Sequence, residues 1–161
     1  MMNQERDSAK VFRRKSIVLS GIALLSFLLL YLGSELAAVL CYDKALDEYD
    51  SKNYMAARYW LILPAYAGRP DAMTLLGTIY ATGKLGPVDG GASEKWLLKA
   101  ALQDNVDAQS ILGIIYATGV GVKMDRIKGT YWLQLAAAKG DAAAIRVLGQ
   151  IGQQSRKPRI D

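Results

Sequence analysis

The chain has 161 residues, of which 52% are hydrophobic and 22% are charged, a balance typical of one modest folded domain and not of a disordered chain. It contains no histidine and a single cysteine, Cys41, which excludes histidine-based catalytic sites and an intrachain disulfide. The formal charge of +5 is concentrated at the two ends of the chain. No stripe of alternating basic and aromatic residues accompanies this charge, so we expect no nucleic-acid binding.

The first expected element is a membrane helix over residues 16–34. This stretch, SIVLSGIALLSFLLLYLGS, has no charged residue in 19 positions (34 − 16 + 1). As a helix it would be about 28 Å long, close to the hydrocarbon thickness of a bilayer. Basic residues in the segment 1–15 precede it and acidic residues dominate the segment after it, so the positive-inside rule places residues 1–15 in the cytoplasm. We therefore expect a single-pass protein of the bacterial inner membrane, with the rest of the chain in the periplasm.

A cleaved signal peptide is the alternative to an anchor. A signal peptide has a shorter apolar stretch of about 7–15 residues and small residues before the cut, whereas Glu35 interrupts the place where a cleavage region would begin. The letters LAAVLC ending at Cys41 only faintly resemble a lipoprotein signal, because Leu40 is bulky where that processing needs a small residue. We favour an uncleaved signal anchor and interpret Cys41 as a small hydrophobic residue near the membrane surface.

Beyond this segment the chain repeats itself with a period of 36 residues. Residues 71–83, DAMTLLGTIYATG, and residues 107–119, DAQSILGIIYATG, are identical at nine of thirteen positions. A period in the mid-thirties is typical of a stacked array of helical repeats. The same shift also aligns three tryptophans and three Leu-Gly pairs, which are Trp60, Trp96, Trp132, Leu76-Gly77, Leu112-Gly113 and Leu148-Gly149.

Each repeat is expected to contain two helices. Apolar residues recur at i, i+3, i+4, i+7 and i+8 from Ala72, which predicts one buried face of the first helix. Asp71 stands at the start of this helix, where its carboxylate can cap free backbone amides, and Gly83 is expected to end it. The second helix is expected over about residues 93–103 in one repeat and 126–139 in the next.

Small residues are expected to set how closely the two helices of a repeat pack. Gly77 and Gly113 have no side chain, and Ala100-Ala101 and Ala136-Ala137 are small on the partner helix. The large tyrosine and tryptophan side chains then fill the space on either side of the crossing.

The repeat carries a family resemblance. The pattern A-x-x-x-L-G-x-x-Y-x-x-G-x-G-V-x-x-D-x-x-K-x-x-x-W-x-x-x-A-A-x-x-G, from Ala108 to Gly140, resembles the Sel-one-like repeat, a branch of the tetratricopeptide-like helical repeats. The resemblance covers about residues 42–152. It implies an all-α fold, a short α-solenoid of antiparallel helix pairs, in a repeat domain of residues 35–152. We interpret residues 42–70 as a degenerate opening pair, 141–152 as a closing helix and 153–161 as a basic polar tail.

Three departures from the family pattern lead to further expectations. The loop before the first expected second helix is rich in Pro and Gly, so that helix should start late, near Ser93. Pro64 aligns with Ala100 in a helix interior, so the Trp60 helix should kink or stop near Leu63. Gly129 stands where the family usually has alanine, at a cost of about 1 kcal/mol inside a helix.

No motif predicts catalysis. The stretch GVGVKMD lacks the Gly-Lys-Ser/Thr ending of a phosphate-binding loop and follows no strand. Asp104 and Asp107 flank a turn before a helix, where capping is the simpler role, and the tryptophans fall at core positions. We therefore predict that the protein is not an enzyme, with no catalytic residue, cofactor, metal ligand or small-molecule substrate.

The remaining candidate is a surface. In tetratricopeptide-like arrays the first helix of each pair forms most of the concave face, so the resemblance implies a partner-binding face carried by these helices. Its small, polar residues and an exposed Ile114 would suit a protein partner, but equally an idle solvated face, and the sequence leaves both open. The implied positions are Asp71, Thr74, Thr78 and Thr82 in one repeat, and Asp107, Ser110, Ile114 and Thr118 in the next.

Two functions follow from the resemblance. The first is a non-enzymatic, membrane-anchored protein-interaction module on the periplasmic side, of the adaptor or regulator type. The alternative is an immunity protein that binds and neutralises a secreted antibacterial effector, such as a phospholipase of the type VI secretion system.

Overall fold

The computed structural model describes residue 28 and residues 30–156. The chain divides into two compact units, Met1–Val39 and Leu40–Asp161. The segment 1–15 and most of the predicted membrane helix over residues 16–34 lie outside the described residues, as does the end of the predicted tail. Among the residues that are described, no helix is both long and apolar enough to cross a membrane.

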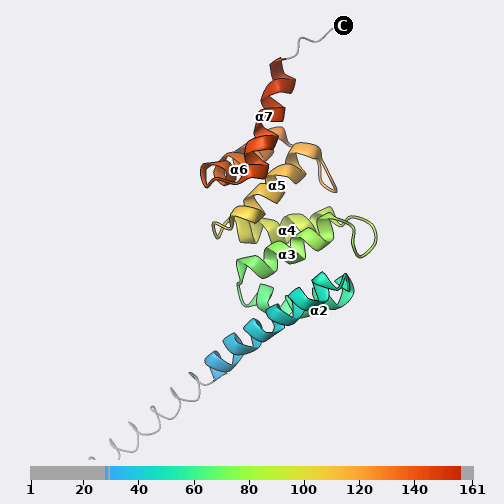
Figure 1. The fold of residues 1–161 in the computed structure, drawn as a ribbon, viewed down its shortest axis with the longest axis vertical. Helices are drawn as coiled ribbons and strands as arrows, with labels where there is room; N and C mark the ends of the chain where they lie inside the picture. Colours follow the sequence, from blue (N-terminus) through green and yellow to red (C-terminus); the bar gives the residue numbers. More distant parts are fainter. Residues whose placement is uncertain (1–27, 29, 157–161) are drawn as a thin grey trace, which may run out of the picture. The chain divides into compact units, whose positions relative to one another are not determined.

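The described part of the unit that begins at Leu40 consists of helices joined by short loops (Figure 1). Its first helix ends at residue 50 and is called helix 40–50 below. The fold is an all-α solenoid, as the repeat predicted. The remaining helices are α2 (Tyr54–Tyr66), α3 (Pro70–Ala81), α4 (Gly90–Ala101), α5 (Val106–Thr118), α6 (Arg126–Ala138) and α7 (Ala142–Arg156).

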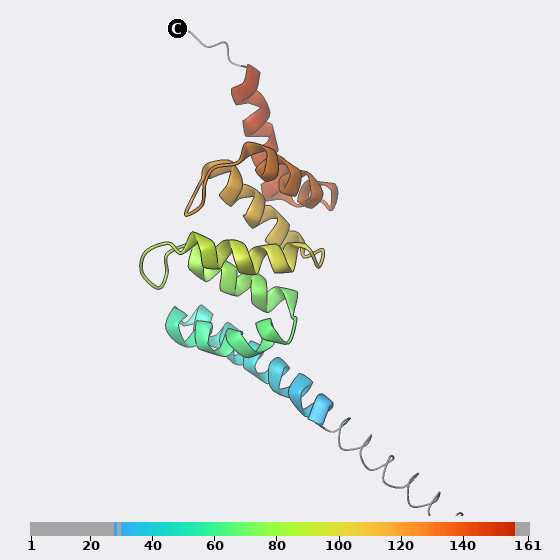
Figure 2. The ribbon, with the colours of Figure 1, turned by 180° about the vertical axis from the view of Figure 1, so that it is seen from behind.

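Helix pairs stack in chain order (Figure 1, Figure 2). Helix α3 packs against α2 and α4, and α5 packs against α4 and α6. In addition, α3 contacts α5, and α5 contacts α7. These helices alternate along the chain with α4 and α6, so α3, α5 and α7 form one row of the array. We call helix 40–50, α3, α5 and α7 the first helices, and α2, α4 and α6 the second helices.

The helices begin at well-defined caps, although not where the sequence placed one of them. The N-cap of α3 is Arg69, whose side chain makes no capping hydrogen bond, and Pro70 follows it at the first helical position. Asp71 therefore does not cap α3, but it lies in the first turn, where a carboxylate meets the positive end of the helix dipole. Four other helices have side-chain caps that accept from an amide of the first turn, namely Asn53, Asp89, Asn105 and Asp125.

The prediction that the second helix of the earlier repeat starts late is wrong. Helix α4 begins at Gly90, and Asp89 Oδ1 accepts a hydrogen bond of 2.9 Å from the Ala92 amide. The amide of Asp89 also donates to the Tyr80 carbonyl, as the amide of Asp125 donates to the Tyr116 carbonyl 36 residues later. The loop before α4 and the loop before α6 therefore both end with the same backbone hydrogen bond, although their sequences differ.

Helix α2 does not stop near Leu63, as Pro64 had suggested. It continues to Tyr66, and the Ala67 amide still donates to the Leu63 carbonyl. Pro64 lies in the last turn, where its missing amide removes a single helical bond.

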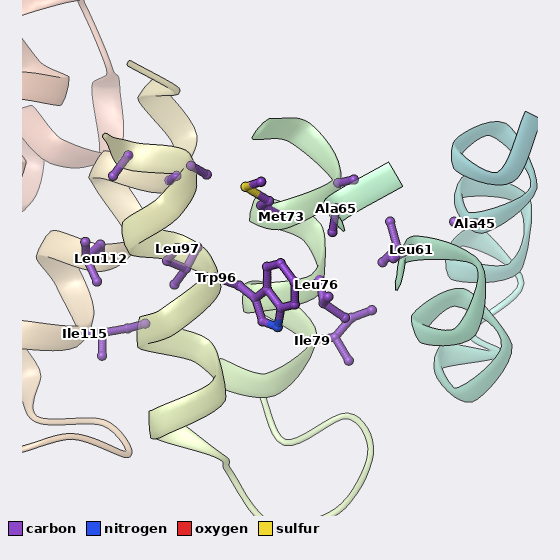
Figure 3. Packing of buried hydrophobic residues seen from close by; sticks show 14 of the residues in the cluster. Ala45, Leu61, Ala65, Met73, Leu76, Ile79, Trp96, Leu97, Leu112 and Ile115 are labelled. Atoms are coloured by element: carbon purple, nitrogen blue, oxygen red, sulfur yellow. The ribbon is translucent and has the colours of Figure 1, made fainter. Parts of the chain in front are cut away.

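The core lies between the stacked helices. Trp96 projects from α4 toward Leu76 and Ile79 of α3 (Figure 3), and all three side chains are buried. Trp132 is also buried, whereas Trp60 is only partly so. The three tryptophans spaced by 36 residues therefore take part in the packing, as their spacing predicted.

Glycine permits the closest helix crossings, as predicted. A Cβ built on Gly77 would lie 2.6 Å from Leu97 Cγ, and one on Gly113 would lie 2.9 Å from the Leu133 amide nitrogen. The departure at Gly129 also has a packing reason, because a Cβ there would lie 2.8 Å from the Ala117 amide nitrogen. Two glycines face each other where α5 crosses α6.

Candidate functional site

A groove of about 520 Å³ runs along the first helices of the array. Its walls come from helix 40–50, α3, α5 and the start of α7, and we call it the first-helix groove. It contains six of the residues that the resemblance implied, which are Asp71, Thr74, Thr78, Asp107, Ser110 and Ile114.

Thr82 and Thr118 do not line the groove. Both are exposed at the C-terminal ends of α3 and α5, and their hydroxyls donate to the carbonyls of Thr78 and Ile114, one turn earlier in the same helix. The concave face ends before these positions because α3 and α5 each terminate there.

Ile114 is not the exposed residue that the sequence suggested. It is half-buried and packs against the cluster formed by Leu133, Ala136 and Ala144. The closing helix α7, which carries Ala144, covers it in part. Ile114 therefore contributes to a groove wall instead of projecting into solvent.

Thr74 is buried, and its hydroxyl is fully engaged. Thr74 Oγ1 donates to one of two nearby oxygens, the Pro70 carbonyl at 2.8 Å or Asn105 Oδ1 at 3.1 Å. Asn105 is the N-cap of α5, and its Oδ1 also accepts from the Ala108 amide at 2.9 Å. Its Nδ2 donates to Asp71 Oδ1 at 2.9 Å. One side chain thus joins the groove wall of α3 to the start of α5.

The same arrangement recurs one repeat later. Ser110 is buried, and its Oγ donates to Asp141 Oδ1 at 2.8 Å, while that oxygen also accepts from the Ala144 amide at 2.6 Å. Asp141 follows Asn105 by 36 residues (141 − 105). We call the two links, Thr74–Asn105 and Ser110–Asp141, the cap rungs.

The cap rungs change the meaning of the predicted polar positions. Thr74 and Ser110 hold successive first helices together and have no hydroxyl proton left for a partner, whereas Asp71 and Asp107 are exposed. Asn105 and Asp141 were not predicted from the sequence, because neighbouring aspartates had been expected to cap these helices. Their 36-residue spacing, each three positions before a buried alanine, was the available signal.

The floor of the groove is largely apolar. Leu75 and Ile111, which follow Thr74 and Ser110 in the sequence, line the groove together with Tyr42 and Leu46 of helix 40–50. The periodicity predicts Leu75 on the buried face of its helix. The positions of Tyr42 and Leu46 do not follow from the sequence, because the opening pair departs most from the repeat pattern.

The charge of the groove is negative. Asp71, Asp107 and Asp141 line it, and no lysine or arginine is among its lining residues. Burial, and then the negative charge of Asp71, raise the pKa of the Tyr42 hydroxyl, so this side chain stays neutral. Arg69 lies against the same ring, with its guanidinium carbon 4.5 Å from the ring centroid.

These carboxylates do not form a metal centre. In the part of the chain that the structure describes, no three His, Cys, Asp or Glu side chains are close enough to hold a metal ion. The groove therefore offers separate carboxylates beside apolar side chains.

The fold and the groove define a short helical-repeat protein with a concave face built from its first helices. The Sel1 repeat family model matches residues 31–68, 70–105 and 106–141, which is more than half of the chain. The chain therefore belongs to the Sel1 repeat family, whose members generally mediate protein–protein interactions as non-enzymatic scaffolds. The first match begins at residue 31, earlier than the resemblance alone had placed it.

Two solved structures are similar to this chain. A Sel1 repeat protein from Oxalobacter formigenes is 40% identical over 61% of this chain, with a TM-score of 0.56. The protective antigen c5321 of uropathogenic Escherichia coli strains, which displays an SLR fold, is 28% identical over 73% of this chain, with a TM-score of 0.68. The matched regions span only 29% and 26% of those two chains. No curated protein matches this chain significantly.

Proposed function

We propose that the protein is a membrane-tethered interaction module whose first-helix groove binds a segment of a protein partner in the periplasm, in the manner of an adaptor or regulator. The observation that carries the proposal is the groove itself. It is a hollow lined by residues of three successive first helices and of α7, and it has an apolar floor and exposed carboxylates. The interaction role that is general in the Sel1 repeat family supports it.

The fixed walls of the groove support the same proposal. The cap rungs order the polar wall residues before any partner arrives, so binding would not have to immobilise them. A preformed surface loses less conformational entropy on binding than a mobile one.

Site-specific photo-crosslinking in cells tests the location of the interface. A photoreactive amino acid at Thr78, in the groove, should capture a partner, whereas one at Gln134, exposed on the second helix α6, should not. Capture from Gln134 alone would move the interface to the face of the second helices. Capture from neither position would contradict the proposal.

The tether is a separate part of the proposal. Its support is the uncharged stretch of residues 16–34, with basic residues before it and mainly acidic residues after it. A reporter that is active only in the periplasm, fused after residue 161, should be active in cells. Activity of a cytoplasm-only reporter at the same position would overturn this topology.

An immunity role is a narrower form of the same proposal. The groove would then hold a secreted antibacterial effector beside the membrane, and the resemblance to such proteins is its support. Deletion of the gene should make cells sensitive to their siblings in a competition assay. Unchanged competition would leave the adaptor role and remove the immunity role.

A further inference from the structure

The charge of the first-helix groove is opposite to that of the whole chain. The chain carries a formal charge of +5, yet the only charged side chains that line the groove are the carboxylates of Asp71, Asp107 and Asp141. Chain-wide electrostatics would repel a basic partner. A local concentration of carboxylates in a hollow attracts one to that place, because a concave site focuses the field.

These carboxylates retain free hydrogen-bonding capacity. Asp107 is exposed and has no hydrogen bond or ion pair with any described residue. Asp71 accepts from Asn105 through Oδ1, and Asp141 uses Oδ1 for Ser110 and Ala144, so the second oxygen of each makes no such bond within the described chain. Lysine or arginine side chains can occupy these positions without breaking a cap rung.

The spacing of the carboxylates favours separate cations on one extended chain. Asp71 and Asp107 stand at the same position of α3 and α5, which are in direct contact, and packed helices lie about 8–10 Å apart. A polyproline-II segment rises about 3.1 Å per residue with three residues per turn, so every third side chain recurs on one face after about 9.3 Å. A basic residue at every third position therefore matches successive first helices.

The floor adds a second requirement. Leu75 and Ile111 line the same groove as the carboxylates, and Leu46 of helix 40–50, which also lines it, is exposed. Apolar side chains between the basic residues of the partner would cover this surface and remove it from water.

We propose that the occupant of the first-helix groove is an extended peptide segment that carries lysine or arginine at every third position with apolar residues between. This inference rests on the proposed function, because it names the chemistry of the partner that the groove binds. The carboxylates of Asp71 and Asp107 bind the cations, and the apolar floor binds the residues between them.

A labelled peptide of three Arg-Leu-Pro units tests this chemistry, with three Glu-Leu-Pro units as its charge-reversed control. Binding to the full chain in a non-ionic detergent is followed by fluorescence anisotropy. The basic peptide should bind saturably and more weakly as salt is raised, and the acidic peptide should not bind. Equal binding of both peptides, or binding of neither, would overturn the inference.

Matched variants locate the binding. The double variant Asp71→Asn/Asp107→Asn keeps the shape of both side chains and should weaken binding of the basic peptide at least tenfold. The control variant Asp47→Asn/Asp104→Asn removes the same charge at residues that do not line the groove, and it should change binding less than twofold. Equal losses in the two variants would show attraction by net charge alone and would overturn the inference.

Two other occupants would give distinct results. If the basic C-terminal tail filled the groove, removing residues 157–161 would tighten peptide binding. If a second copy filled it, peptide binding would weaken as the protein concentration rises. Either result overturns the inference, whereas the photo-crosslinking at Thr78 decides independently whether the groove binds a protein partner at all.

Discussion

The two complete repeats, α3–α4 and α5–α6, share most of a thirteen-residue phrase but hold their helices together differently. In the second repeat Gly113 of α5 faces Gly129 of α6, and any added Cβ would meet backbone atoms. In the first repeat the position of Gly129 is taken by Ser93, and a Cβ on Gly77 would mainly meet the Leu97 side chain. At the α5–α6 crossing an added Cβ on either glycine would meet backbone atoms within 3.0 Å, whereas at the α3–α4 crossing its nearest contacts are side-chain atoms of Leu97.

The two cap rungs, which link successive repeats, also differ from each other. Asn105 joins three partners, because its amide both accepts and donates, whereas the carboxylate of Asp141 can only accept. The residues that the two repeats share therefore determine the architecture, whereas the residues that differ determine the strength of each link and the chemistry of the groove.

The largest expected effect comes from Gly113→Ala. The new Cβ would lie 2.9 Å from the Leu133 amide nitrogen and 3.0 Å from the Gly129 carbonyl oxygen, neither of which can rotate away. We expect the free energy of unfolding to fall by about 2–3 kcal/mol. Gly77→Ala should cost about half as much, since Leu97 can adjust and alanine favours the helix. Urea denaturation followed by circular dichroism measures both, with Gly149→Ala, whose Cβ has open space, as the control. Equal losses at Gly77 and Gly113 would remove the distinction between the two crossings.

The cap rungs rank next. Asn105→Ala removes the cap of α5, the hydrogen bond to Asp71 and one of the two acceptors of the Thr74 hydroxyl, so we expect a loss of about 2–3 kcal/mol, at about 1 kcal/mol for each interaction. Asp141→Ala removes one cap and one hydrogen bond and should cost about 2 kcal/mol. The same denaturation experiment compares them. A larger loss for Asp141→Ala would reverse the proposed ranking of the rungs.

A smaller effect distinguishes Tyr116 from Tyr80, its counterpart one repeat earlier. Burial, followed by the hydrogen bond that Tyr116 donates to Glu94, raises the pKa of the Tyr116 hydroxyl above its usual value of 10.0. A group whose pKa is raised on folding contributes stability below the unfolded pKa, and that contribution is lost as pH rises above about 10. Tyr116→Phe should therefore cost about 1 kcal/mol near neutral pH, from the lost hydrogen bond, and the difference from the natural protein should shrink above pH 10.

The matched control for this prediction is Tyr80→Phe. Tyr80 accepts a hydrogen bond of 3.5 Å from Arg58 and, among the described residues, donates none to a carboxylate. Denaturation at several pH values should show the alkaline convergence for Tyr116→Phe alone. The same convergence in both variants would contradict the role assigned to Glu94.

The sequence predicted the parts of the fold that depend on periodicity. The 36-residue period and the apolar face of each first helix predicted the helix pairs, and the glycines at Gly77 and Gly113 predicted the close crossings. Helix boundaries were predicted less well. The start of α4 is set by the N-cap Asp89, 36 residues before the N-cap Asp125, although the loop rich in Pro and Gly before it had suggested a later start.

The groove was predicted only in part. The family resemblance identified six of the eight residues of α3 and α5 that line the groove, because first helices share one face. It could not show that Thr74 and Ser110 have their hydroxyls engaged, since their partners Asn105 and Asp141 are 31 residues further along the chain. Neither could it place Tyr42 and Leu46, which follow no repeat pattern. Binding by any of these residues stays a prediction.

The cap rungs also determine how the array would respond to a pulling force. Because Asn105 and Asp141 each cap one helix while bonding the previous first helix, the start of α5 or α7 cannot unwind without releasing its neighbour. Among the described residues no such cap link precedes α3, because its N-cap Arg69 makes no side-chain capping hydrogen bond. Here helix 40–50 is joined to α3 and the loop after it by cation–π contacts, one between Arg69 and the Tyr42 ring and one between Lys84 and the Tyr49 ring. Tension applied along the chain should therefore separate helix 40–50 from α3 first and leave the later repeats extending as one mechanical unit.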